Sequence, residues 1–199
     1  MPPRPALDGA ALASLFTDAR THHGWLPLPV TAEQLQAVYA LACWGPTSMN
    51  SQPMRVKFIS NPARKEALLG CLNPGNVAQT RAAPVTAVIG HDLDFAARRP
   101  QLFAHKAGAR EGFDRDPEWA AATAVRNGPL QAAYLMLAAR ALGLDCGPMS
   151  GFDTARVDAL FWAGTRVRTN FLCNLGHGDP AALHACGPRL DFDAASELL

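Results

Sequence analysis

The chain has 199 residues, of which 49% are hydrophobic, and its formal net charge is +1 at pH 7. This size and composition predict one domain over residues 1–199 with a sizeable core, and they exclude a disordered chain. The near-zero charge gives no indication of a nucleic-acid or acidic-membrane surface, and no run of about 18 apolar residues predicts a membrane span.

In chain order, the opening residues MPPRPALDGA lack the apolar core of a signal peptide, so we expect a cytoplasmic protein. Apolar residues at helical spacing then predict a helix over about 7–20, with Asp8 as its N-cap. Thr31 and Gln34 form a capping-box pattern ahead of a second helix. The apolar face of this second helix is expected to contain Leu35, Val38, Tyr39 and Ala42.

The middle of the chain alternates between strand and helix signals. RVKFIS (55–60) alternates as a strand does, KEALLGCL (65–72) predicts a short helix, and the apolar PVTAVIG (84–90) predicts a strand buried on both faces. Residues 91–117 mix arginines and phenylalanines without a clean period. We interpret this segment as a partly helical excursion over the surface, which is either a lid or pocket wall or a solvated connection.

The second half of the chain opens with a long helix over about 117–142, which Gly143 terminates. A loop over 147–153, a helix capped by Asp153 or Thr154 and a buried strand over 169–179 follow. No internal repeat or linker interrupts this order, so we expect one α+β domain. The long helix is expected to bury a stripe made of Trp119, Ala122, Leu130, Ala133, Tyr134, Leu137 and Ala138.

Several kinds of functional site have no support in the sequence. The five cysteines are odd in number and lack Cys-x-x-Cys spacing, and no His-x-x-x-His pair occurs, so we expect free thiols and no metal site. No G-x-G-x-x-G motif follows a strand, which argues against a Rossmann nucleotide site. GPMSG resembles a nucleophile elbow only loosely because Ser150 is one position late, so a serine hydrolase remains an alternative.

Five longer motifs of the chain are LFTDARTHHGW, WGPTSMNSQP, GNVAQTRAAPVTA, RNGPLQAAYLMLAARALGLDCGPMSGFD and PRL. Together they resemble the flavin-dependent nitroreductase family over nearly the full chain, and within it the malonic semialdehyde reductase branch of pyrimidine degradation. The resemblance implies an α+β nitroreductase-like fold with a central mixed or antiparallel sheet flanked by helices. It also implies FMN bound at the interface of a homodimer that buries helix 117–142 and the corner Pro46–Ser48, and NAD(P)H as co-substrate.

The family's cofactor contacts can be transferred by position. Arg20, Thr21 and Arg189 match residues near the FMN phosphate and ribityl chain, where an arginine fork suits a phosphate. His23, Asn76 and Gln79 match residues at the pyrimidine edge of the flavin. The loop near flavin N5 corresponds to Pro148, Met149, Ser150 and Gly151, and the corner that reaches the flavin of the other subunit corresponds to Pro46, Thr47, Ser48 and Asn50.

Two departures from the family concern the redox chemistry. His23 and Gln79 stand where the family often has permanent cations, and a less positive edge stabilises reduced flavin less. Because a histidine titrates near neutral pH, this stabilisation is expected to depend partly on pH.

The resemblance predicts the reduction of malonic semialdehyde to 3-hydroxypropanoate, with hydride passing through N5 of FMN and no catalytic side chain assigned. The substrate carboxylate is expected to meet Arg98, Arg99, Lys106 or Arg110. A broad nitro or quinone reductase and a flavin-binding protein without turnover remain alternatives.

Overall fold

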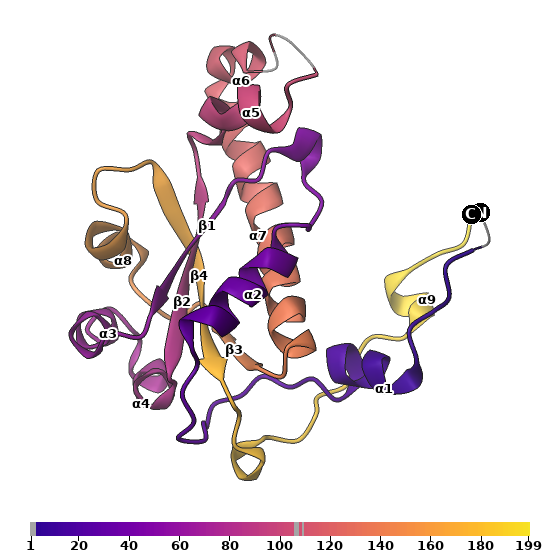
Figure 1. Ribbon diagram of the computed structural model, residues 1–199, viewed down its shortest axis with the longest axis vertical. Coiled ribbons are helices and arrows are strands. Elements are labelled where there is room, and N and C mark those ends of the chain that lie inside the picture. Colours follow the sequence, from indigo (N-terminus) through magenta and orange to yellow (C-terminus); the bar gives the residue numbers. More distant parts are fainter. Residues whose placement is uncertain (1–2, 106–107, 109) are drawn as a thin grey trace.

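A four-stranded antiparallel sheet forms the centre of the protein (Figure 1). The computed structural model describes residues 3–105, 108 and 110–199. Its strands are β1 (Met54–Ile59), β2 (Val85–Asp92), β3 (Asp145–Met149) and β4 (Val167–Gly176), in the spatial order β1-β2-β4-β3. The predictions of β1, β2 and β4 are confirmed, whereas the prediction of a loop from residue 147 was wrong. Pro148 suggested a loop, but it lies in a strand at the edge of the sheet, where a missing N–H is tolerated.

Helices cover both faces of this sheet (Figure 1). The helices α2 (Ala32–Ala42) and α7 (Pro117–Ala141) lie on one face, and α3 (Pro62–Leu69) and α8 (Thr154–Phe161) lie on the other. Next to α3 lies α4 (Pro74–Ala82), which the sequence did not predict. The shorter helices are α1 (Gly9–Leu12), which continues into a π-helical turn (Ala13–Thr17), α5 (Arg99–Leu102), α6 (Glu111–Arg115) and α9 (Phe192–Ala195). Single 3₁₀ turns occur at Ser48–Asn50, Phe95–Arg98 and Pro180–Ala182.

The core consists of two apolar layers separated by the sheet. Ala87 and Ile89 of β2 pack with Leu135 of α7 in one layer, whereas Val88 packs with Val157 of α8 in the other. Successive side chains of a strand point to opposite faces, so β2 contributes to both layers. The prediction that this strand is buried on both faces is therefore confirmed.

The helix α7 buries a different face from the one that the sequence predicted. The predicted stripe is largely exposed in the single chain, where Trp119 is 45%, Leu130 48% and Tyr134 41% exposed. Small and amide residues take the buried face instead, because the helix lies close against the sheet and its amides bind backbone groups of residues 48 and 54. The buried face comprises Ala120, Thr123, Ala124, Asn127, Gly128, Gln131, Ala132, Leu135, Ala138 and Ala139.

Local capping signals are confirmed. Asp8 accepts a hydrogen bond from Ala11 N at 2.8 Å, and Thr31 with Gln34 forms the complete capping box of α2. Asp153 caps α8 through Arg156 N at 3.0 Å. Gly143 follows α7 with φ +77°, a left-handed conformation that glycine adopts without steric cost. The first helix is shorter than expected, because it gives way to the π turn after residue 12.

The segment 91–117 is partly helical, as predicted, but it does more than lie on the surface. The aromatic rings of Phe95 and Phe113 meet edge to face with centroids 5.0 Å apart, and both side chains are buried against Ala120 and Ala124 of α7. This segment therefore has a small core of its own. One residue of the predicted substrate set, Lys106, lies outside the described residues.

Both ends of the chain leave the body of the molecule. The N-terminal arm with α1 and the C-terminal tail with α9 extend together to one side (Figure 1). Large apolar side chains on these extensions are exposed, among them Phe16 on the arm and Phe192 and Leu198 on the tail. Within the described part of the chain, no helix combines the length and hydropathy that crossing a membrane requires.

Candidate functional site

The segment around His22 lies along the open edge of β3 and brings predicted site residues together. Backbone bridges join Thr21 to Cys146 and Trp25 to Gly178, and His22 N donates to Cys146 O at 3.0 Å. Side chains in such an extended segment alternate in direction. His22 is accordingly buried, whereas the predicted cofactor residues on either side of it, Thr21 and His23, are exposed.

A chain of hydrogen bonds links this segment to the loop after β3. His23 Nδ1 bonds Gln79 Oε1, Gln79 Nε2 donates to Asn76 Oδ1 at 2.7 Å, and Asn76 Nδ2 donates to Gly151 O at 2.9 Å. We call these four residues the amide relay. Gln79 and Asn76 are one helical turn apart on α4, so both amides face the same side of that helix. The relay thus joins the segment of His23, the helix α4 and the loop after β3. These are the parts of the chain that carry the predicted pyrimidine-edge residues and the predicted N5 loop.

The loop after β3 leaves little space for a side chain at Gly151. A Cβ atom on Gly151 would lie 2.6 Å from Asn76 Nδ2, so a larger residue would displace the relay. Thr80 Oγ1 contacts Met149 Sδ at 3.5 Å and accepts from Asn174 Nδ2 at 3.2 Å, which fixes the end of β3 beneath the loop. Pro148 is half-buried in β3, and Ser150 is exposed at the turn.

The two predicted phosphate arginines have different surroundings. Arg20 Nη2 donates to His184 O, and the His184 ring lies 5.5 Å from that of His23. Arg189 lies on the exposed tail and donates to Gly187 O at 2.9 Å and Pro188 O at 3.2 Å. The described contacts join Arg20 to the amide relay through His184, and the convergence of Arg189 on the same phosphate stays a prediction.

The corner Pro46–Asn50 forms a second cluster between α2, α5 and α7. Ser48 N donates to Asn127 Oδ1 of α7 at 2.7 Å, and Asn50 Nδ2 donates to Leu102 O of α5 at 2.8 Å. Thr47 Oγ1 accepts from Gln52 N at 3.2 Å, and Pro46 is exposed. A small pocket of about 380 Å³ opens here beside Trp44, which is 80% exposed.

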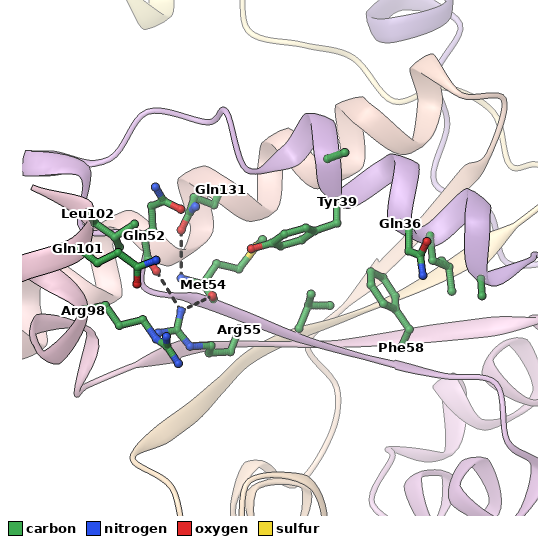
Figure 2. A pocket seen from close by; sticks show the side chains of 14 residues that line it. Gln36, Tyr39, Gln52, Met54, Arg55, Phe58, Arg98, Gln101, Leu102 and Gln131 are labelled. Carbon is green, nitrogen blue, oxygen red and sulfur yellow. Dashed lines mark hydrogen bonds between the residues drawn. The ribbon is translucent and has the colours of Figure 1, made fainter.

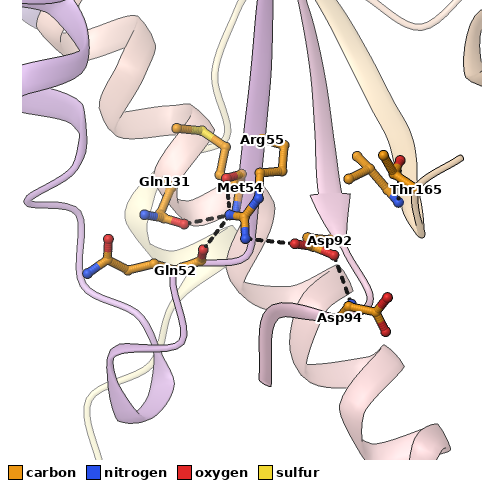
Figure 3. A network of polar contacts seen from close by, with 8 residues as sticks. Gln52, Met54, Arg55, Asp92, Asp94, Gln131 and Thr165 are labelled. Atoms are coloured by element: carbon orange, nitrogen blue, oxygen red, sulfur yellow. Dashed lines mark hydrogen bonds and ion pairs between the residues drawn. The ribbon is translucent and has the colours of Figure 1, made fainter. Parts of the chain in front are cut away.

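The far end of this corner is anchored to the sheet (Figure 3). Arg55 donates to the carbonyl groups of Gln52 at 3.0 Å and Met54 at 2.8 Å, and it forms a 2.7 Å ion pair with Asp92. Gln131 Oε1 of α7 accepts from Met54 N at 3.1 Å. In the described part of the chain, no hydrogen bond joins the corner directly to the amide relay. The corner and the amide relay are therefore two separate clusters in the single chain.

Of the predicted substrate arginines, Arg98 is exposed and has no ion-pair partner within the described residues. It lines a pocket of about 790 Å³ between α2, β1 and α5 (Figure 2). Arg110 is paired with Asp114 at 3.0 Å. Arg99 is 1% exposed and donates to Met49 O, and burial lowers the pKa of its guanidinium. The structure thus does not offer Arg99 to a substrate.

Three supporting residues were not found from the sequence. His22 Nε2 lies 3.3 Å from Asp145 Oδ1, and Asp145 Oδ2 accepts from Gly178 N at 2.8 Å, so this pair ties the His22 segment to the end of β4. Gly178 leaves no space for a Cβ beside the His22 ring. Asn127 is the third residue. The signal that could have found it is an amide beside Ala124 and Gly128 on one face of the helix.

The chain has relatives of similar length. The model of the Nitroreductase family matches residues 18–177. A protein of Leptothrix cholodnii, provisionally named NADH dehydrogenase/NAD(P)H nitroreductase, is 55% identical over 98% of this chain and 98% of its own. A similarly named protein of Stenotrophomonas maltophilia (strain K279a) is 53% identical over 97% of this chain and 98% of its own.

Solved structures share the fold. A nitroreductase family protein from Streptococcus pneumoniae superimposes with a TM-score of 0.82 at 21% identity, covering 94% of this chain and 100% of its own. A protein from Exiguobacterium sibiricum, provisionally titled a nitroreductase and solved in complex with FMN, gives a TM-score of 0.84 at 17% identity, covering 98% and 99%. At these identities the likeness concerns the fold alone.

Proposed function

The chain belongs to the Nitroreductase family, and from this membership we propose that it is an FMN-dependent reductase that uses NAD(P)H. The observation that carries the proposal is the convergence of His23, Asn76, Gln79 and Gly151 at the end of β3, with Arg20 joined to them through His184. These residues come from three separate parts of the sequence. Together they supply a guanidinium, an imidazole, two side-chain amides and a backbone loop.

The donor set suits the chemistry of FMN. A guanidinium fork matches a phosphate, and amide and imidazole groups match the carbonyl and N–H pattern of the flavin pyrimidine ring. Arg20 and Thr21 would hold the phosphate and ribityl chain, and His23, Asn76 and Gln79 would hold the pyrimidine edge. The tight approach of Gly151 to Asn76 would keep the backbone of the N5 loop fixed. FMN, when bound, supplies hydride transfer between nicotinamide and acceptor.

The protein's own contribution is orientation. His23 Nδ1 bonds Gln79 Oε1, and Gln79 Nε2 donates to Asn76 Oδ1, so each side chain of the amide relay is held by its neighbour. The relay would thereby fix the directions of the imidazole and of both amides toward the pyrimidine edge of FMN.

A homodimer accounts for features that the single chain leaves unexplained. The outer face of α7 exposes Leu130 and Tyr134, and the neighbouring corner exposes Trp44. Contiguous apolar surface of this kind marks an association site. In the proposed dimer, a second copy covers this face, and the corner of one subunit meets the amide relay of the other. We therefore include in the proposal that each flavin site needs both subunits, with more than about 2,000 Å² buried in total. A cytoplasmic location also stays a prediction.

For the acceptor we propose malonic semialdehyde, which would be reduced to 3-hydroxypropanoate. The support is the motif resemblance together with Arg98, an exposed cation at the corner end of the large pocket (Figure 2). Arg98 forms no ion pair within the described residues, so its charge is available to a substrate carboxylate. A neutral aldehyde of similar size would lack this interaction.

Two alternatives have specific observations in their favour. The names of the relatives favour a broad nitro or quinone reductase. The hydrogen-bonded relay alone would also serve a flavin-binding protein without turnover. A serine hydrolase has less support, because His22 and His23 bond Asp145 and Gln79 and neither serves Ser150.

One comparison separates these functions. On a single FMN-loaded preparation, kcat/KM is measured with NADH and NADPH for malonic semialdehyde, propanal, a nitroaromatic compound and a quinone. We expect malonic semialdehyde to exceed propanal clearly, and Arg98→Ala to lower kcat/KM for the semialdehyde but not for the quinone. An inert semialdehyde beside rapid nitroaromatic or quinone reduction would replace the semialdehyde assignment with the broad reductase. Failure of NAD(P)H to reduce the flavin would favour the non-catalytic alternative.

A further inference from the structure

The corner between Pro46 and Pro53 adopts a strained backbone. Met49, Asn50 and Gln52 have φ angles of +51°, +50° and +43°, a left-handed conformation in which residues other than glycine rarely occur. Each such residue costs about 1 kcal/mol or more, with asparagine at the low end. Because three of them fall within four positions, surrounding contacts must hold this shape.

Contacts from outside the corner hold it. Asn127 of α7 accepts from Ser48 N, and Arg55 of β1 donates to the carbonyl of Gln52. From α5, the carbonyl of Leu102 accepts from Asn50 Nδ2, and Arg99 Nη1 donates to the carbonyl of Met49. The two contacts from the segment 91–117 thus both bind left-handed residues.

Arg99 is costly for the fold itself. Its guanidinium lies 4.4 Å from the ring centroid of Phe103 and 5.6 Å from that of Phe113. Within the described residues it pairs with no carboxylate, and Nε and Nη2 have no hydrogen-bond partner. A buried charge without a counter-ion usually destabilises a protein relative to an apolar residue of similar size. The presence of Arg99 is therefore better explained by the hydrogen bond that it donates to the carbonyl of Met49.

We infer that Arg99 is a positioning residue, which holds the Pro46–Asn50 corner in the left-handed shape that meets the flavin of the partner subunit. This inference rests on the proposed function. Arg99 itself touches neither substrate nor cofactor. Its role is to fix the carbonyl of Met49 so that the hydroxyl and amide groups of Thr47, Ser48 and Asn50 keep their directions. The segment 91–117 would thereby act on the flavin site from a distance.

The test compares three variants of the FMN-loaded protein. Arg99→Met removes the donor but fills the space between the two aromatic rings, and Arg99→Lys keeps the charge and one possible donor. Arg115→Met is the control, because Arg115 is an exposed arginine in α6 of the same segment. For each variant we would measure FMN content, oligomeric state, thermal midpoint, the visible absorbance and circular dichroism of bound flavin, its midpoint potential, and kcat and KM separately.

The expected result separates positioning from stability. Arg99→Met should keep FMN, dimer and thermal midpoint, or raise that midpoint, because the apolar side chain avoids the cost of a buried charge. Its flavin spectrum and midpoint potential should shift, and kcat should fall about tenfold or more, the scale of a small misplacement at a reacting centre. Arg99→Lys should be intermediate and Arg115→Met unchanged.

The contrary results are equally definite. An Arg99→Met dimer whose flavin spectrum, potential and kcat match those of the control would overturn the inference. If Arg99→Met does not fold, Arg99 serves the fold after all, unless Arg99→Lys folds normally and still shows the shifted flavin. Colourless wild-type protein that cannot take up FMN would instead defeat the proposed function, so the two failures are distinguishable.

Discussion

The amide relay makes a quantitative prediction for Asn76→Ala. The substitution removes two hydrogen bonds, one from Asn76 Nδ2 to Gly151 O at 2.9 Å and one from Gln79 Nε2 to Asn76 Oδ1 at 2.7 Å. Each is worth about 0.5–1.5 kcal/mol net, and together they contribute about 2 kcal/mol. Alanine recovers about 0.5 kcal/mol through its higher helix propensity, because position 76 lies inside α4. The free energy of unfolding should therefore fall by about 1.5 kcal/mol.

The assay is urea unfolding of the FMN-free protein, followed by the affinity of the same variant for FMN. A loss of this size should lower the thermal midpoint by about 3–6 °C in a protein of this length. Asn73→Ala is the matched control, because Asn73 precedes the same helix but its side chain caps no backbone group. Asn76→Asp keeps the acceptor for Gln79 and should lose about half as much as Asn76→Ala.

The FMN affinity should follow the same order, because the relay orients the residues at the pyrimidine edge. Equal unfolding free energies for Asn76→Ala and Asn73→Ala, within about 0.5 kcal/mol, would refute the reasoning. Such a result would mean that the relay does not hold the loop at Gly151 in solution.

Three other predictions follow from the same structure. Arg20→Ala should raise the Kd for FMN by about 10–150-fold, the equivalent of a charge-assisted bond of about 1.5–3 kcal/mol, whereas the exposed Arg64→Ala should not; equal values for the two variants in flavin fluorescence titrations would contradict this. Leu130→Glu should yield a folded monomer by light scattering, with FMN binding weakened, and a persistent dimer would exclude α7 from the interface. Burial lowers the pKa of His91, so just below pH 6.5 the unfolded chain binds more protons than the folded one, and the unfolding free energy should decrease as the pH is lowered through this range; His91→Gln should flatten this slope in chemical denaturation, and an unchanged slope would assign it to other groups.

Local signals explain why much of the fold could be predicted. Asp8, the pair Thr31 and Gln34, and Gly143 act on backbone groups within a few residues of themselves, so their effect is visible in a short stretch of sequence. The helix α4 was missed because Pro74, Gly75 and Asn76 together suggest a turn. Proline is nevertheless well suited to the first turn of a helix, where its missing N–H would have had no partner.

The buried face of α7 could not be predicted from hydrophobicity. The periodicity of apolar residues predicts where a helix runs. It predicts which face is buried only when that face is made of apolar residues. In α7, Asn127 and Gln131 lie inside because they bind Ser48 N and Met54 N, which are 79 and 77 positions away. The apolar side chains of Leu130 and Tyr134 lie outside, as expected if another subunit covers them.

The candidate site combined residues that local patterns could not join. The bond between His23 and Gln79 spans 56 positions, and that between Asn76 and Gly151 spans 75. The motif resemblance named these residues, and the fold brought them together. It did not name His22 and Asp145, although the alternation of exposed and buried residues around His22 is a signal that an extended segment would give.

The identity and amount of bound flavin test the central proposal most directly. The molar mass of the purified protein is measured by light scattering. Its released chromophore is identified by mass spectrometry, and the molar ratio of chromophore to protein chain is determined. The account predicts a yellow dimer with about one FMN per chain and no FAD. A colourless protein that FMN cannot restore, or a monomer that holds FMN as tightly as a dimer, would contradict a flavin site shared between two subunits.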